Sequence, residues 1–319
     1  MLSNARGDVI TPTQLWNNLT ALMTDSVAKN LEVEALVSKE LNTDHIPLHL
    51  LCKSHTVEGL DRSNIKVLSE VEITVKLREK IEAVNPGIKI FIRGEQSIII
   101  AGIKSILNLV SHAKSASPTN LAHQFDVICE REGIVKHMSL YQERRFAKLG
   151  YVAGSILDSM DLLHTLLNEA HTHNLHTETV RIFLDCEFFS SALSVLSYFS
   201  YHVSLPLLNC VEKSSQSELC NILPQLYEDL KAGRISTLAD FVVKRRHFEV
   251  QDLTSEVEKL LLNKFCEHAA AVIKLQCGRE YMPEETDKPR VTQINKLSPE
   301  SRGGLPTHNL LPEWDFSHF

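Results

Sequence analysis

Glycine and proline are both scarce in this chain of 319 residues, which contains 12 and 11 of them. No internal repeat with a period of about 20–50 residues is visible, so a solenoid or propeller is not predicted. No Gly-x-Ser-x-Gly, P-loop or dinucleotide glycine pattern occurs either. The sequence therefore lacks the motifs of α/β-hydrolases, P-loop NTPases and Rossmann enzymes.

An excess of positive charge is also missing, because the net charge is −7. That balance argues against a protein held to nucleic acid by bulk electrostatics and leaves open only a local basic face. The seven cysteines are odd in number and lie in apolar helical contexts, as expected for reduced intracellular thiols. Met1–Asp8 has no apolar h-region, so no secretory signal is predicted.

One long uncharged run raises the question of a membrane. Phe188–Val211 is long enough to span a bilayer, but it contains six serines, His202, Pro206 and Asn209. This polarity fits a buried core helix better, and no membrane partner is predicted.

Strand signals are confined to the first part of the chain. Leu19–Thr24 and His45–Cys52 are short apolar runs, and Pro47 places the second at a sheet edge or moves its start to Leu48. Between them, Ser26 can cap a helix that runs to about Asn42.

The remainder is predicted to be helical because apolar residues recur at helical spacing. Asn85-Pro86-Gly87, Gly133 and Gly233 are expected to end helices, and Gly150 and Gly154 to break or bend one. From Pro283 the chain is polar and punctuated by proline, typical of a tail without fixed structure. The predicted helices are Glu58–Val84, Gly94–His112, Ser117–Glu132, Leu140–Ala170, Thr177–Val203, Ser215–Ala232 and Leu253–Cys277.

Two short blocks in the first part of the chain carry the only pattern that points to a chemistry. The first apolar run ends at Asp25, which could present a carboxylate to metal ions at a sheet edge. The second ends in Cys52-x-x-His55, half of a zinc site. The alternatives are a helix N-terminal acid for Asp25, and a buried thiol with a hydrogen-bonded histidine for Cys52 and His55.

These blocks resemble hAT-type transposases, which are DDE enzymes with an RNase H-like core. The block from Leu22 to Asn30 is similar to the family's second catalytic-acid region, and the Cys52–His55 block to its next strand. The resemblance extends loosely over Leu15–Lys231. It implies Asp25 as a catalytic residue, DNA as a partner, a nuclear location, and Mg²⁺ or Mn²⁺ only if an active core exists.

The match lacks several parts of that family's machinery. No earlier strand ending in Asp, no zinc finger and no tandem-Trp motif is found. A single carboxylate cannot hold two cations. We therefore expect a truncated or remodelled transposase-derived protein that is catalytically inactive and retains nucleic-acid binding. The acids that could complete the site by position are Glu143, Glu187, Glu212 and Glu218, and none is distinguished.

The alternative is an intracellular helical scaffold that binds protein partners and uses its Trp314-bearing tail as a linear motif. Further side-chain clusters are interpreted first as solvated helix ends or faces, and second as metal or phosphate contacts. They are His164, His171, His173 and His176, then Arg144-Arg145, then Lys244-Arg245-Arg246-His247.

The predicted fold class is mainly α with a small β segment, a partial RNase H-like core followed by a helical domain. The predicted divisions are 1–61 for the strand-helix-strand segment, 62–282 for the helical domain and 283–319 for the tail.

Overall fold

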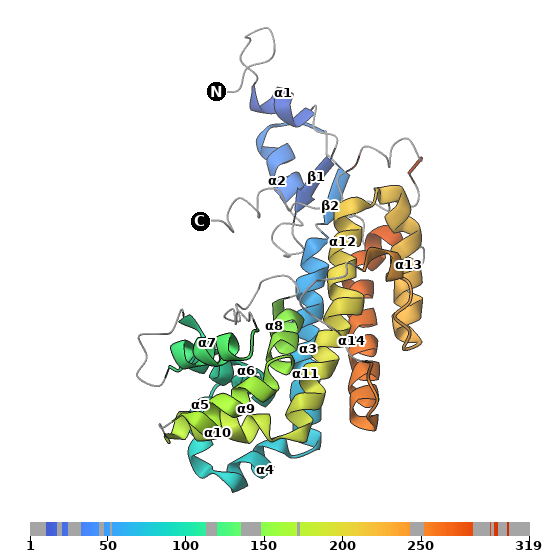
Figure 1. Cartoon of the computed structure of the whole chain (residues 1–319). Helices are drawn as coiled ribbons and strands as arrows, with labels where there is room; N and C mark the ends of the chain where they lie inside the picture. The colour runs from blue at the N-terminus through green and yellow to red at the C-terminus, as the bar shows by residue number, and fades with distance from the viewer. Residues whose placement is uncertain are drawn as a thin grey trace. The chain divides into compact units, whose positions relative to one another are not determined.

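A computed structural model gives the conformation of most of the chain (Figure 1). It divides into two compact units, one made of residues 1–57, 208–229 and 270–319, the other of 58–207 and 230–269. The first unit thus gathers three separate stretches, unlike the consecutive domains that the sequence predicts. The structure describes residues 11–17, 21–24, 33–44, 48–51, 53–112, 120–134, 148–170, 173–242 and 252–282, with 294, 297, 298 and 305.

The first unit begins with helix α1 (Pro12–Asn17). Thr11 and Gln14 cap it reciprocally: the Gln14 N–H donates to Thr11 Oγ1 at 3.1 Å, and the Thr11 N–H to Gln14 Oε1 at 3.0 Å. The indole N–H of Trp16 donates to Ser38 Oγ of helix α2 (Val33–Glu40) at 2.9 Å. This buried hydrogen bond ties α1 to α2.

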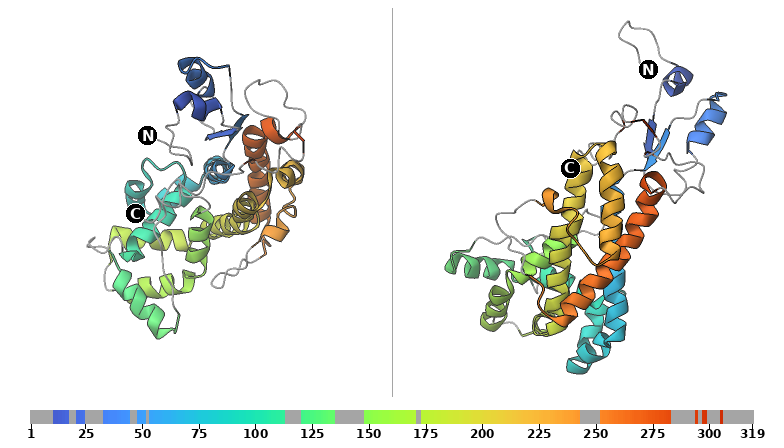
Figure 2. Two further views of the ribbon diagram at one scale, coloured as in Figure 1. Left: turned by 90° about the horizontal axis from the view of Figure 1, so that it is seen from above. Right: turned by 90° about the vertical axis from the view of Figure 1, so that its right-hand side faces the viewer.

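Strands β1 (Ala21–Thr24) and β2 (Leu48–Leu51) pair in parallel, with Ala21 opposite Leu48 and Thr24 opposite Leu51. Figure 2 shows the two short arrows side by side. They lie within the two apolar runs of the sequence. No third strand joins them among the described residues.

The predicted partial RNase H-like core is wrong, because such a core is a mixed sheet and the part of the chain that the structure describes holds only a parallel pair of strands. The physical reason is that, outside these two four-residue strands, the apolar side chains of the described chain follow helical spacing. The predicted helical character of the protein is confirmed.

The second unit is built from helices around α6 (Ile98–Val110). Both faces of α6 are buried, as expected for a helix that is apolar all round. Helices α5, α7, α8, α10 and α11 pack against it. The bounds are α3 Ser54–Thr74, α4 Leu77–Val84, α5 Lys89–Ile92, α7 Ala122–Arg131, α8 Lys148–Leu157, α9 Met160–Glu169, α10 Leu175–Leu184 and α11 Glu187–Phe199.

Three further helices follow, namely α12 (Leu205–Lys213), α13 (Gln216–Lys231) and α14 (Glu256–Tyr281). Each of them, like α3, contributes residues to both units. Gly233 has a positive φ of 69° just past α13, as predicted for a residue that ends a helix. Gly133, with φ of 67°, follows α7 in the same way.

A buried carboxylate fixes the start of α6. Glu72 of α3 accepts hydrogen bonds from the N–H groups of Ile98 at 2.8 Å and Ile99 at 3.0 Å, and from the Ser97 hydroxyl at 2.6 Å. Ser97 Oγ in turn accepts from the Ile100 N–H at 3.3 Å. Three of the N–H groups that a helix start leaves unpaired are thereby satisfied.

Gly150 permits a close approach of α8 to α11 and does not break its helix, contrary to prediction. A Cβ built on it would lie 2.0 Å from the Ser200 Cβ and 2.6 Å from the Leu196 carbonyl oxygen. The break in the predicted Leu140–Ala170 helix falls instead between α8 and α9, after Leu157. Packing decides the role of this glycine, and local propensity does not reveal it.

The long predicted helix 58–84 is also divided. It begins earlier, at Ser54, and it ends at Thr74 because Lys76 adopts a left-handed conformation with φ of 54°. The predicted stop at Asn85-Pro86-Gly87 is confirmed, since the Asn85 side chain accepts from the Gly87 N–H at 2.8 Å.

The long uncharged run forms α11, a π-helical turn at Ser200–Ser204, and part of α12. The turn precedes Pro206, whose ring cannot follow a regular α-helical turn. Phe189, Leu193 and Phe199 of this run are fully buried, which confirms a core helix. Among the described helices none is by itself long and apolar enough to cross a membrane; only α10 and Glu187–Lys213 taken together, across a 70° bend, pass that test.

Candidate functional site

A buried polar cluster in the first unit is centred on Lys53, which follows β2 and precedes α3. Its ammonium forms an ion pair with Glu280, near the end of α14, and both side chains are at most 2% exposed. The same ammonium lies 5.2 Å from the centre of the Tyr281 ring. Because the ring face is electron-rich, this contact adds a second favourable interaction for the buried cation.

Neighbouring polar groups complete this Lys53 cluster. The Tyr281 hydroxyl donates to Gln216 Oε1 of α13. Thr56 Oγ1 and Cys277 Sγ lie 3.6 Å apart and form a hydrogen bond in which either group can donate. All of these residues belong to the first unit, although they come from three separate parts of the chain.

Burial keeps the Tyr281 phenol and the Cys277 thiol of the Lys53 cluster protonated. It raises the pKa of Tyr281 well above its ordinary value, and the neighbouring Cys277 and Cys220 thiols add to this effect. Burial likewise raises the pKa of the Cys277 thiol, with Lys53 opposing the shift. A neutral phenol and a protonated thiol are a poor base and a poor nucleophile.

The predicted site residues are described only in part. Asp25 and Cys52 lie outside the described residues. His55 lies in the first turn of α3 and is half-buried. From this block, the structure brings Lys53 into contact with an acidic residue, Glu280.

Metal binding can be tested against the donors that are described. Among those residues no group of three or more His, Cys, Asp or Glu side chains converges. The carboxylate of Glu280 is already neutralised by Lys53. The described side chains thus do not fit a pair of Mg²⁺ or Mn²⁺ ions, which need several carboxylate oxygens.

The predicted histidine cluster does not form a site among the described residues. His176 Nε2 lies 3.0 Å from the Ser105 carbonyl oxygen, and its ring stacks on Phe91 at 5.2 Å. Burial lowers the pKa of His176, so it is neutral and structural. His173 is exposed, His164 lies 3.9 Å from Asp185, and His171 is outside the described residues.

The other predicted clusters resolve similarly. Arg144-Arg145, Lys244–His247 and Glu143 are outside the described residues. Glu218 accepts from the Ser215 N–H at 2.7 Å and caps the start of α13. Glu187, in the first turn of α11, is exposed.

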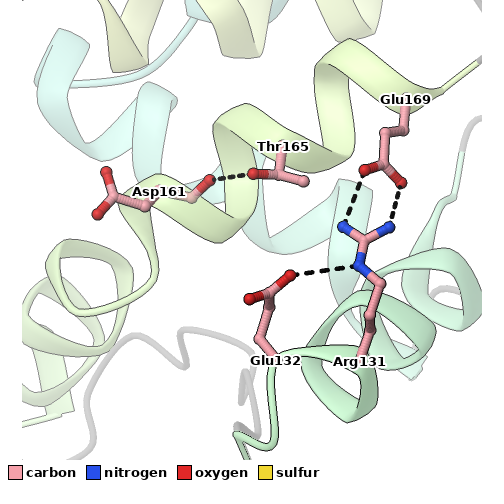
Figure 3. Close-up of polar contacts among 5 residues, drawn as sticks. All are labelled: Arg131, Glu132, Asp161, Thr165 and Glu169. Atoms are coloured by element: carbon pink, nitrogen blue, oxygen red, sulfur yellow. Dashed lines mark hydrogen bonds and ion pairs between the residues drawn. The ribbon is translucent and has the colours of Figure 1, made fainter.

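Figure 3 shows a second polar group, which joins α7 to α9. Arg131 makes two hydrogen bonds to Glu169, at 2.8 and 3.0 Å, and one to Glu132 at 3.2 Å. These contacts raise the pKa of Arg131 and lower that of Glu169. Since Arg131 and Glu169 are half exposed, the group is a surface clasp between helices rather than a reaction site.

Asp61 of α3 is a carboxyl with a strongly raised pKa. Burial raises its pKa to about 7, with a smaller contribution from Glu58, while a hydrogen bond from the Leu149 N–H opposes the rise. The raised pKa of Asp61 makes the stability of the folded protein depend on pH.

Sequence reasoning missed the acidic partner in the Lys53 cluster. Glu280 and Tyr281 lie in the last turn of α14, where the sequence shows only an ordinary helix end. The one available signal is that Lys53 itself sits inside the Cys52–His55 block.

Comparison with known proteins gives no identification. No protein-family model, curated protein or solved structure matches the chain. Function must therefore be argued from the side chains and from the resemblance of the two N-terminal blocks.

Proposed function

We propose that the chain is a transposase-derived protein that binds DNA without cutting it. One observation carries the proposal: Lys53, which lies within the Cys52–His55 block, is buried and paired to Glu280. Lys53 follows β2 and Glu280 comes from the last turn of α14, so the ion pair links two distant stretches of the chain.

The physical argument concerns the charge of the buried carboxylate. A divalent cation binds where carboxylate charge is available. Here an internal ammonium already supplies the positive charge, and displacing it would leave a buried lysine unpaired at a cost of several kcal/mol. The Lys53 cluster is thus better suited to holding three stretches of chain together than to binding divalent metal.

The test uses the purified full chain with duplex DNA. We expect salt-dependent binding and no cleavage or strand transfer with Mg²⁺ or Mn²⁺. Cleavage that Asp25→Asn abolishes would overturn the non-catalytic part of the proposal. Failure to bind duplex DNA at low salt would overturn the DNA-binding part.

A second candidate function is a scaffold for protein partners. It is favoured by three aliphatic side chains on the second unit that are unusually exposed, namely Ile73 at 75%, Val84 at 69% and Ile90 at 73%. The salt dependence separates the two candidates, because contacts to DNA phosphates weaken steeply as salt rises and apolar contacts do not.

A further inference from the structure

Helices α4 and α5 carry a concentration of positive charge that contrasts with the acidic chain. Between residues 76 and 93 there are five basic residues and only two acidic ones, Glu79 and Glu82. All five basic residues are exposed. We call them the α4–α5 basic face: Lys76, Arg78, Lys80, Lys89 and Arg93. On α4, Arg78 and Lys80 flank the exposed side of the helix, because they lie on opposite sides of the buried Leu77 and Ile81.

Glu82 contacts one basic residue of each of the two helices. Its carboxylate lies 3.7 Å from Arg78 Nη1 on α4 and 3.4 Å from Lys89 Nζ at the start of α5. Glu82 is mostly covered, whereas Arg78 and Lys89 remain about half exposed or more. One carboxylate thus positions two cations, which keep most of their hydrogen-bond donors for another ligand.

The other three cations are not engaged by acids within the described chain. No carboxylate of the described residues pairs with Lys76, Lys80 or Arg93. Lys80 lies one turn after Lys76, and Arg93 ends α5 four residues after Lys89. The face therefore has positive charge in excess of what the fold itself uses.

We infer that the α4–α5 basic face binds the phosphate backbone of duplex DNA. The inference rests on the proposed function and adds the surface that performs it. Charge complementarity is the argument, since lysine and arginine that neutralise phosphates supply sequence-independent affinity. Helix α4 is about 12 Å long, and about three or four phosphates of one strand occur over that length of the duplex axis.

The salt dependence of binding gives a quantitative test. Each neutralised phosphate adds about 0.9 to the steepness with which log affinity falls against log salt, so five contacts give a slope of about −4.5. Lys80→Gln combined with Arg93→Gln removes two cations without touching the Glu82 contacts. We expect the slope to become shallower by about 2 and the affinity to fall on the order of 10–100-fold at about 0.1 M salt.

A matched control removes the same net charge elsewhere. Lys259 and Lys264 are exposed on α14 and contact Glu256 and Glu267. Lys259→Gln combined with Lys264→Gln should leave the slope and affinity for a duplex of about 20 base pairs unchanged. Circular dichroism checks that both double variants keep their helices.

The outcomes separate the claim that the chain binds DNA from the claim that the basic face does the binding. A shallower slope in the Lys80/Arg93 variant alone supports the basic face. Equal binding by the two double variants overturns the inference and leaves the proposed DNA binding intact. No duplex binding by the unaltered chain, or binding to vesicles of anionic phospholipid instead, overturns both.

Discussion

The buried pair of Lys53 and Glu280 makes a strong demand on stability. Removing one partner of a buried ion pair leaves the other charge without compensation, which typically destabilises a protein by about 3–5 kcal/mol. We expect losses of this size for Lys53→Met and for Glu280→Leu separately, because both side chains are at most 2% exposed. Such a loss is a large part of an ordinary free energy of unfolding of about 5–15 kcal/mol.

The double variant Lys53→Met/Glu280→Leu should be far less destabilised. It buries neither charge, and replacing a buried pair with apolar side chains of similar volume is often neutral or stabilising. We therefore expect the double variant to be more stable than either single variant, a coupling that a double-mutant cycle measures directly.

Urea unfolding followed by tryptophan fluorescence provides the assay. Trp16 is buried in the first unit and reports on it when Trp314 is replaced by phenylalanine. Unfolding free energies in which the double variant loses the sum of the two single losses would refute the pairing. Small losses in both single variants would show that the two side chains are solvated.

Three further predictions concern the second unit. Glu72→Ala leaves the buried Ile98 and Ile99 N–H groups without their acceptor, so urea denaturation should show a loss of about 3 kcal/mol, and Glu72→Gln a smaller one. Gly150→Ala should lose about 2–3 kcal/mol in the same assay, because its methyl would meet Ser200 Cβ at 2.0 Å; Ser200→Gly should recover part of it. Asp61 has its pKa raised from 3.8 to about 7, so the folded state binds its proton more tightly than the unfolded state. Stability should then fall as the pH rises from about 4 to about 7, and unfolding measured at stepped pH should show that Asp61→Asn removes this dependence.

The helices were the most predictable part of the fold. Where apolar residues recur every three or four positions, as in α14, the sequence indicates the helix, whereas α6 was predicted from the length of its apolar run. The helix ends at Asn85-Pro86-Gly87 and Gly233 were predicted because proline and glycine stop helices through local backbone chemistry. What is local in the chain can be inferred from the chain.

Breaks set by packing could not be predicted. Lys76 follows the end of a helix with a left-handed backbone that lysine rarely adopts, and the neighbouring residues give no sequence signal of this conformation. Gly150 has the sequence signature of a helix breaker, yet its missing side chain admits the backbone of α11. Gly150 was predicted to disrupt its own helix, whereas it allows a neighbouring helix to approach closely.

The acidic partner of the candidate site was missed for a related reason. The transposase resemblance favours acids between Glu143 and Glu218 by position, far in sequence from Glu280. Glu280 became a partner of Lys53 because the first unit assembles stretches that the second unit interrupts twice in sequence. Long-range assembly of this kind leaves no periodic signal in either stretch.

The buried pair and the basic face belong to different units, so each can be altered without changing the residues of the other. Lys53 and Glu280 belong to the first unit, and the α4–α5 basic face to the second. Variants of the buried pair that still fold should keep the salt slope for DNA, because no phosphate contact is removed. Variants of the basic face should keep the unfolding free energy, because exposed charges contribute little to it. If a folded variant of the buried pair bound DNA more weakly while its salt slope stayed unchanged, the Lys53 cluster would contribute to DNA binding in a way that its burial alone does not predict.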